Sequence, residues 1–285
     1  MTFDVSAEIA ALCVYPIKSC AGVALNECFL DTTGLDLDRA WMVVDAHGAF
    51  LSQRELPRMA LIQPTLKTTE MVLRAPGMLA LHISIEAVEQ PVQVTVWSDT
   101  VSAFDMGNLA AQWFSDFLGQ SARLVRFNPE VQRLSDARWT GDIQAPNLFS
   151  DGFPVLVLSQ AALDEFNVKL MEVGHAAVSM ARFRPNIVLS GLPAHEEDRL
   201  DVLHIATELQ ETQLKLVKPC PRCPIPNVDP TTAISHPAVG DLLQTYRRSD
   251  VLGGAVTFGM NAIVQHGAGQ VLRVGQGVHG NYRFE

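Results

Sequence analysis

Short runs of β-forming residues, separated by turn signals, constrain the fold of this chain more than any other feature. In the first part of the sequence these runs are Ile9–Tyr15, Ala40–Val44, Met71–Leu73, Leu79–Ile85 and Val92–Val96. Thr-Thr-Gly, His-Gly and Ala-Pro-Gly lie between them and favour tight turns. Many short strands at this spacing are typical of a β-barrel or a sandwich.

Similar runs return later in the chain, after a polar and turn-rich stretch from residue 128 to 152 that contains little strand signal. They are Val155–Leu158, Ile187–Leu189, Leu214–Val217, Val256–Val264 and Val271–Val274. We therefore predict an α+β fold dominated by β-structure. A small N-terminal β domain is expected over residues 1–125 and a mixed β-barrel domain over residues 126–285.

Three helices are expected among the strands. Asn108 is a suitable N-cap for a helix that ends at Gly119, and Ser159 is a suitable N-cap for a second helix. Pro237 suits the first turn of a third helix, whose C-terminal dipole would be stabilised by Arg247. Their apolar stripes are interpreted as core-facing.

The segment Lys215–Asp229 carries the clearest chemical signal. It reads Lys-Leu-Val-Lys-Pro-Cys-Pro-Arg-Cys-Pro-Ile-Pro-Asn-Val-Asp, so that two thiols, Cys220 and Cys223, lie among four prolines. Because proline is excluded from helix interiors and central strands, we expect a stiff loop. Lys218 and Arg222 should favour the thiolate, which is the form that binds metals or attacks electrophiles.

The two thiols also allow simpler interpretations. A structural zinc ion needs four ligands, but His236 stands alone and the other cysteines, Cys13, Cys20 and Cys28, are scattered upstream. A thioredoxin-like redox motif should open a helix, which Pro224 and Pro226 disfavour. The loop alone leaves two alternatives open: a thiolate that binds a soft metal, and a structural or incidental thiol.

Composition excludes several classes of protein. The net charge of −10 argues against general nucleic-acid binding. No apolar run reaches the roughly 18 residues that a membrane span requires, and the N-terminus does not resemble a signal peptide. Five cysteines without framework spacing fit a reducing compartment. We expect a cytoplasmic, monomeric protein that does not bind membranes.

Two purely basic segments, residues 178–186 and 212–228, stand out in this acidic chain. They predict a pocket for an anion, because guanidinium groups bind phosphate well, although ordinary surface clustering is the alternative. Lys18 and Ser19, after a predicted strand, form a phosphate-holding pair. Arg184 precedes a proline that enforces extended backbone, and Asn186 adds an amide. Each of these signals is weak by itself.

One Gly-x-Gly-x-x-Gly sequence runs from Gly275 to Gly280. A dinucleotide-binding fingerprint must open a helix inside a βαβ unit, and only five residues follow Gly280. We interpret these glycines as a C-terminal turn.

Taken together and in their order along the chain, the cysteine loop and the segments around Lys18 and Arg184 resemble the MOSC proteins. This family is named for the C-terminal domain of molybdenum cofactor sulfurases, and a β-barrel domain often precedes that domain. Within that family the chain is similar to the mitochondrial amidoxime-reducing component and its bacterial relatives. The resemblance rests on Tyr15–Gly22, Leu35–Val44, Asp151–Leu163, Phe183–Leu189, Cys220–Pro230 and Leu242–Tyr246. It implies an N-terminal β-barrel-like domain and a MOSC β-barrel domain with a few peripheral helices.

The resemblance also implies a molybdenum cofactor, Mo-molybdopterin, which is a pterin dithiolene with a terminal phosphate. Cys223 matches the cysteine that ligates molybdenum, and Asp229 matches an acid of the same loop, close to the metal. The other matching residues would bind the cofactor: Lys18, Ser19 and Arg39 from the N-terminal domain, and Arg184, Asn186 and Arg222 from the MOSC domain. The chain departs from the animal reductases at Gly152 and Phe153, where small hydroxyl residues are lost.

By resemblance, the chain is expected to reduce small N-hydroxylated compounds: hydroxylamines, amidoximes and N-hydroxylated bases. It has no iron–sulfur or flavin motif, so electrons would come from a separate ferredoxin- or flavodoxin-like donor and its reductase. Two alternatives remain. Cys223 could carry a persulfide supplied by a pyridoxal-phosphate desulfurase, or the protein could carry the cofactor without catalysis.

Overall fold

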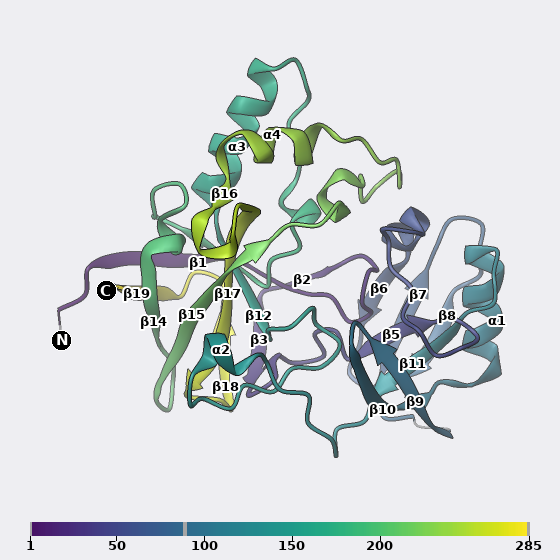
Figure 1. Ribbon diagram of the computed structural model, residues 1–285. Coiled ribbons are helices and arrows are strands. Elements are labelled where there is room, and N and C mark those ends of the chain that lie inside the picture. The colour runs from purple at the N-terminus through teal and green to yellow at the C-terminus, as the bar shows by residue number, and fades with distance from the viewer. Residues whose placement is uncertain (1, 88–89, 284–285) are drawn as a thin grey trace.

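The computed structural model describes residues 2–87 and 90–283, and shows the β-dominated α+β fold expected from the sequence (Figure 1). Two bodies lie side by side. One holds the strands of the second half of the chain together with the first strand, and the other holds β5 to β11 with the helix α1. The predicted fold class is confirmed.

The larger body is a closed barrel of seven strands. Around the ring the strands are β12 (Val155–Ser159), β13 (Ile187–Ser190), β1 (Val5–Val14), β19 (Gly277–Tyr282), β14 (Leu200–Ala206), β15 (Glu211–Pro221) and β17 (Ala255–His266). The pairing of β12 with β17 closes it. Two short strands extend the sheet, β2 (Val23–Leu25) beside β1 and β16 (Arg248–Ser249) beside β17. Alternating inward side chains such as Ile9, Leu214 and Met260 fill the interior.

Strand β1 connects the two halves of the sequence. Ile9 pairs with Leu189 of β13, and Val5 pairs with Gly280 of β19. The first strand of the chain is therefore an integral part of the barrel built by the last strands. The domain boundary predicted between residues 125 and 126 remains a prediction. Strand β1 precedes that boundary in the sequence, but in space it belongs to the barrel formed by the strands that follow it.

The glycine-rich C-terminal segment differs from the expectation. Gly275 does adopt a turn conformation with φ of +84°, but residues 277–282 form β19, between β1 and β14. A Cβ added at Gly280 would lie 2.9 Å from Cγ2 of Val5, so the glycine permits close packing inside the barrel. The interpretation of the whole segment as a turn was wrong, because a glycine in a strand carries no side-chain periodicity.

Within residues 2–87 and 90–283, the smaller body contains two sheets and one α-helix. One sheet has the order β5 (Trp41–Val44), β11 (Arg123–Phe127), β10 (Asp99–Asp105) and β9 (Gln90–Val96), and the other has β6 (Gln63–Leu66), β7 (Glu70–Arg74) and β8 (Leu81–Ser84). Outside the smaller body, a small sheet of β18 (Gln270–Arg273), β3 (Glu27–Asp31) and β4 (Gly34–Leu35) packs Leu272, Leu30 and Leu35 against the core of the barrel. The helix α1 (Gly107–Leu118) buries Phe114 and Phe117 against Trp41 and its neighbours.

The helix boundaries largely follow the capping signals. The helix α3 (Gln160–Glu172) begins after Ser159, whose hydroxyl accepts the Ala162 N–H at 3.3 Å, and α1 ends at Gly119 with φ of 73°. Asn108 is not the N-cap of α1, because the helix starts one residue earlier and Asp105 accepts the Gly107 N–H at 2.7 Å. Single-turn elements are α2 (Ala137–Thr140), η1 (Pro57–Leu61), η2 (Met180–Arg182), η3 (Glu196–Arg199), η4 (Ile225–Asn227) and η5 (Asp250–Leu252).

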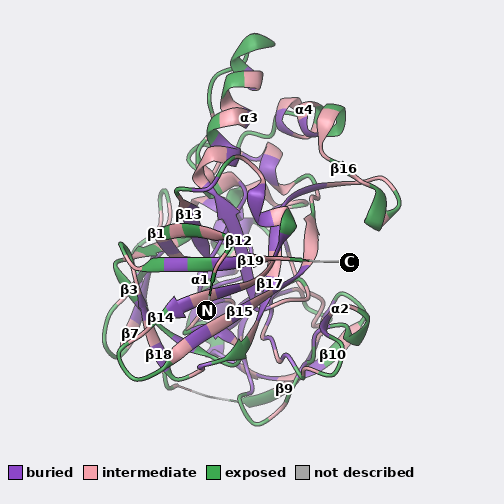
Figure 2. Cartoon of the chain, turned by 90° about the vertical axis from the view of Figure 1, so that its left-hand side faces the viewer, coloured by how far each residue is buried: buried purple, intermediate pink, exposed green. Residues whose placement is uncertain are grey.

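The helix α4 (Ala238–Tyr246) follows Pro237 and packs beside α3 at one end of the barrel. Figure 2 shows exposed residues along the far end of α3 and buried residues where the helices meet the strands. Phe166 and Phe258 meet there edge to face, with ring centroids 5.8 Å apart. Among the described residues, no helix is both long and apolar enough to cross a bilayer.

The proline-rich segment is only partly a loop. Strand β15 continues to Pro221, so Pro219 and Pro221 are strand residues, contrary to the expectation. The pairing of β15 with β14 ends at Lys215, and beyond that residue β15 pairs only with β17, with two shifts of register. One edge of β15 is unpaired there, and proline is tolerated because no N–H is needed. The loop proper begins at Arg222.

Candidate functional site

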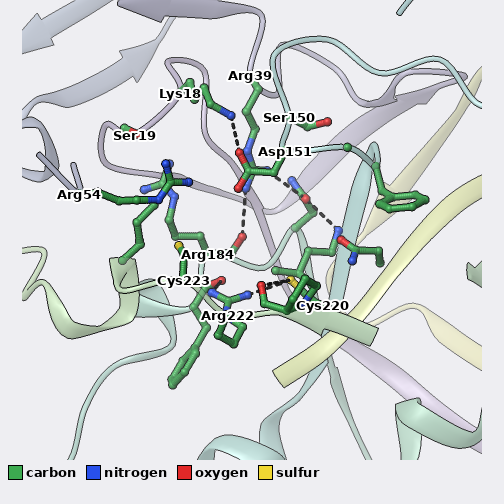
Figure 3. Close-up of a pocket in the computed structure, with 18 residues that line it drawn as sticks. Lys18, Ser19, Arg39, Arg54, Ser150, Asp151, Arg184, Cys220, Arg222 and Cys223 are labelled. Atoms are coloured by element: carbon green, nitrogen blue, oxygen red, sulfur yellow. Dashed lines mark hydrogen bonds and ion pairs between the residues drawn. The ribbon is translucent and has the colours of Figure 1, made fainter. Parts of the chain in front are cut away.

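A pocket lies where the two bodies meet (Figure 3). Its walls come from the turn after β1, the segment before β5, the connection that precedes β12, the turn before β13 and the end of β15. The lining residues are Lys18, Ser19, Arg39, Arg54, Ser150, Asp151, Gly152, Phe153, Leu156, Phe183, Arg184, Asn186, Cys220, Pro221, Arg222, Cys223, Ile225 and Asn261. All predicted site residues except Asp229 are therefore brought together here.

Lys18 is a buried cation with fixed partners. Its side chain is 7% exposed, and Nζ donates to the Phe149 carbonyl at 2.8 Å and to Asp151 Oδ1 at 2.5 Å. Burial lowers the pKa of Lys18, and Asp151 opposes that shift. Burial would raise the pKa of Asp151, but the Lys18 ammonium outweighs it and holds that pKa well below its usual range. The two side chains form an ion pair at the edge of the pocket.

Arg39 is held by three acceptors. Nη1 donates to Asp38 Oδ2 at 2.6 Å and to Asn186 Oδ1 at 3.1 Å, while Nη2 donates to the Arg184 carbonyl at 3.2 Å. Burial alone would lower the pKa of Arg39, but the Asp38 carboxylate reverses the shift and raises it. This guanidinium therefore stays charged inside the protein and is fixed in direction.

Asn186 contributes through its neighbours. It is 1% exposed, its Nδ2 donates to the Cys13 carbonyl at 3.2 Å, and its Oδ1 also accepts the Leu156 N–H at 3.1 Å. The amide was predicted to contact the cofactor. In this structure both of its polar atoms are already occupied, so its evident task is to orient Arg39 and to tie β13 to β1.

The backbone is strained at three residues that line the pocket. Ser19, Arg39 and Arg184 have φ of 68°, 50° and 59°, in the left-handed region that side chains rarely adopt. Arg184 is therefore not in the extended conformation expected before Pro185. Each such residue costs on the order of 1–2 kcal/mol. Strain of this kind concentrates at functional sites, and here it coincides with the residues that the sequence marked as cofactor-binding.

The two cysteines of the loop have different surroundings. Arg222 donates from Nη1 to Cys220 Sγ at 3.1 Å and from Nη2 to the Phe183 carbonyl at 2.8 Å. Cys223 is a free, partly buried thiol for which no hydrogen bond is found within the described residues. Figure 3 shows its sulfur directed toward the arginine side chains of the pocket. The cation predicted to favour a thiolate thus contacts Cys220, and Cys223 is left open to a ligand.

Asp229 lies outside the residues that line the pocket. Its Oδ1 accepts the Thr231 N–H at 2.8 Å and the Thr231 hydroxyl at 2.6 Å, and its Oδ2 accepts from Arg182 at 2.9 Å. These hydrogen bonds, those from Thr231 first, lower its pKa. Such contacts are those of an Asp that caps a turn, so in this structure Asp229 stabilises the loop.

Two charged residues of the pocket were not found by sequence reasoning. Arg54 stacks over the ring of Trp97 at 4.5 Å, and the Trp97 indole donates to Asp151 at 3.3 Å. For Asp151 the sequence does contain a signal, because this residue begins the segment Asp151–Leu163 on which the family resemblance rests. The sequence around Arg54 contains no such signal, because the position of Arg54 in the pocket depends on how the two bodies pack against each other.

The site is suited to an anion that brings most of its own metal ligands. Among the described residues, no group of three or more His, Cys, Asp or Glu side chains is placed to hold a metal ion. Cys223 offers one soft donor, which suits a soft metal. The Nε of Arg222 is buried without a partner in the described structure, and Lys18, Arg39 and Arg184 supply positive charge. This donor set fits a metal–dithiolene cofactor with a phosphate tail.

Two family models and several known proteins match this chain. The family model of the MOSC N-terminal beta barrel domain matches residues 6–121, and that of the MOSC domain matches residues 144–279. The chain is 34% identical to mitochondrial amidoxime-reducing component 1 of Mus musculus, covering 85% of this chain and 72% of that protein. With the human protein of that name the identity is 31%, covering 95% and 82%. With molybdenum cofactor sulfurase of Bos taurus it is 30%, covering 86% of this chain and 29% of the sulfurase.

Proposed function

The chain belongs to the MOSC proteins, and from that membership we propose that it is a molybdenum-cofactor-dependent reductase of N-hydroxylated compounds. The observation that carries the proposal is the position of Cys223. Its free thiol, on a loop stiffened by proline, faces a pocket whose cations come from both bodies of the protein, and unlike Cys220 it accepts no hydrogen bond from Arg222. Amidoximes, hydroxylamines and N-hydroxylated bases are the substrates we expect.

The residues of the pocket divide the binding of the cofactor among them. Lys18, Ser19, Arg39 and Arg184 would hold the phosphate, Arg222 would contact the pterin, and the Cys223 thiolate would bind the metal. When bound, the cofactor supplies two-electron redox chemistry that removes oxygen from a substrate. The protein contributes orientation and charge, which is the usual division of labour in such enzymes.

The neighbouring residues keep these groups in place. Asp38 and Asn186 fix Arg39, and the Phe183 carbonyl fixes Arg222. Asp229 holds the loop that follows Cys223 by accepting from Thr231. Pre-organised side chains lower the entropic cost of binding, so the site is ready for an anionic ligand.

Electrons would reach the site from another protein. A separate ferredoxin- or flavodoxin-like donor with its reductase is part of this proposal. A cytoplasmic location and a monomeric state belong to it as well.

The test begins with expression in a host that makes molybdenum cofactor. Bound molybdenum and pterin are measured first, followed by reduction of benzamidoxime and hydroxylaminopurine with an artificial electron donor. Cys223→Ala should abolish reduction, while Cys220→Ala is the matched control in the same loop and should retain it. Stoichiometric molybdenum without reduction of either compound would show a cofactor carrier instead.

A second function is favoured by one observation, the free Cys223 thiol in a chain similar to a molybdenum cofactor sulfurase. In that case Cys223 would carry a persulfide to an acceptor. Mass spectrometry of the intact protein separates the two functions, since an added sulfur on Cys223 in protein free of molybdenum would contradict the reductase.

A further inference from the structure

Two arginines of the pocket share one aromatic ring. The guanidinium carbon of Arg39 lies 4.4 Å from the centroid of the Tyr15 ring, and that of Arg184 lies 4.1 Å from it. Tyr15 is 2% exposed and does not line the pocket, so it stands behind the two cations. One side chain in the interior therefore contacts both arginines at once.

This arrangement opposes a repulsion. Burial lowers the pKa of Arg184, and the charge of Arg39 lowers it further, because two cations are held close together in the protein. The face of an aromatic ring carries negative charge and attracts a guanidinium at this distance. The Tyr15 ring thus attracts both groups, whereas an aliphatic side chain of similar size would leave them to repel each other.

The position of the ring is itself fixed by the turn. The Tyr15 N–H donates to Asp38 Oδ1 at 2.8 Å, and the Tyr15 carbonyl accepts the Arg39 N–H at 2.9 Å. Arg184 Nη1 donates to the Cys20 carbonyl at 2.6 Å, five residues further along the same turn. A Cβ added at Gly22 would lie 2.6 Å from Cε1 of Tyr15, so the glycine leaves room for the ring.

We propose that Tyr15 is a positioning residue that holds Arg39 and Arg184 as a pair, so that both bind one phosphate-bearing anion. The inference rests on the proposed function only in that this anion is the cofactor. The aromatic face performs the task and the hydroxyl does not, since both contacts are with the ring. Tyr15→Phe should therefore preserve the pair, and Tyr15→Leu should disrupt it.

The test uses the full chain without cofactor and inorganic phosphate as the probe. Phosphate affinity is measured by calorimetry, and the melting temperature is recorded for each variant. Two lost ring contacts should weaken binding roughly tenfold in Tyr15→Leu, while Tyr15→Phe should remain within about twofold of wild type. Tyr246→Leu is the matched control, because Tyr246 packs against His195, does not line the pocket and should leave phosphate affinity unchanged.

Two further results decide the matter. Gly22→Ala keeps Tyr15 but displaces its ring, so it should reproduce the loss, and it carries the test where Tyr15→Leu fails to fold. After expression in a host that makes the cofactor, the bound molybdenum and pterin should be near the wild-type level in Tyr15→Phe and reduced in Tyr15→Leu and Gly22→Ala. Unchanged phosphate affinity in Tyr15→Leu or Gly22→Ala, an equal loss in Tyr15→Phe, or no binding by wild type would overturn the inference. Wild type that binds phosphate but no cofactor would contradict only the proposed function.

Discussion

Replacement of Asp38 by alanine is expected to destabilise the protein strongly, because this carboxylate satisfies two buried partners at once. Its Oδ1 accepts the Tyr15 N–H at 2.8 Å and its Oδ2 accepts from Arg39 at 2.6 Å. Asp38 is 3% exposed, and the Arg39 side chain is 13% exposed. Water therefore has little access to the groups that the mutation would leave unpaired.

The magnitude follows from those two losses. A buried N–H without a partner costs about 1–3 kcal/mol. Removing one partner of a buried ion pair costs about 3–5 kcal/mol, and the lower end applies because Arg39 retains the Asn186 and Arg184 oxygens. A total of about 4 kcal/mol is expected, which corresponds to a fall in melting temperature of about 7 °C for a chain of this length.

Thermal and urea unfolding of the protein without cofactor measure this loss directly. Asp38→Asn keeps one acceptor oxygen and should lose roughly half as much stability. Asp142→Ala, at an exposed position, is the matched control and should melt within about 1 °C of wild type. If Asp38→Ala also melts that close to wild type, the buried pair does not stabilise the fold and the reasoning fails.

Three more predictions concern stability away from the pocket. Burial, with Arg247 and Lys169, lowers the pKa of His195 to about 4 from 6.5. Between these two pKa values His195 is protonated in the unfolded chain but not in the folded protein. About 3 kcal/mol of the free energy of unfolding should therefore be lost as the pH falls from about 6.5 to about 4. His195→Asn, which tolerates the φ of 64°, should flatten that pH dependence in urea titrations, and an equal slope would contradict the assignment. Ser159→Ala should lose about 1 kcal/mol with the cap on Ala162, and a change near zero would show that the cap is dispensable. Gly259→Ala should lose about 3 kcal/mol or more by urea denaturation, since its φ is +79° and a Cβ would lie 2.8 Å from the Val157 carbonyl oxygen. A variant as stable as wild type would mean that the strand shifts to accommodate the methyl group.

The parts of the fold that could be predicted are those with local signals. Ser159, Gly119 and Pro237 mark helix ends in the sequence, and the structure places helix ends at all three. A capping hydroxyl or a left-handed glycine acts on its nearest neighbours, so a short window of sequence contains the whole interaction. The β-rich runs are equally local, since alternation needs only a few residues.

Apart from the N-cap expected at Asn108, the expectations that failed depended on distant partners. Gly280 is a strand residue because Val5 packs against it, and Pro219 is tolerated in β15 because β14 no longer pairs there. At the pocket, family resemblance indicated Lys18 and Arg184, but nothing in the sequence around Arg54 shows that tertiary packing places it beside them. The role of Asp38 was not predicted for the same reason, since it depends on the buried Tyr15 N–H and Arg39 guanidinium to which Asp38 is hydrogen-bonded.

The pairing of β1 with β19 has a consequence for biosynthesis. The strand that leaves the ribosome early finds one of its neighbours only when the far end of the chain has been made, so the ring is completed late. Until then the nascent chain must keep that strand from pairing with other molecules, because an open strand edge invites aggregation. The same adjacency makes a circular permutant feasible, with the two strands joined by a short linker and new ends opened elsewhere.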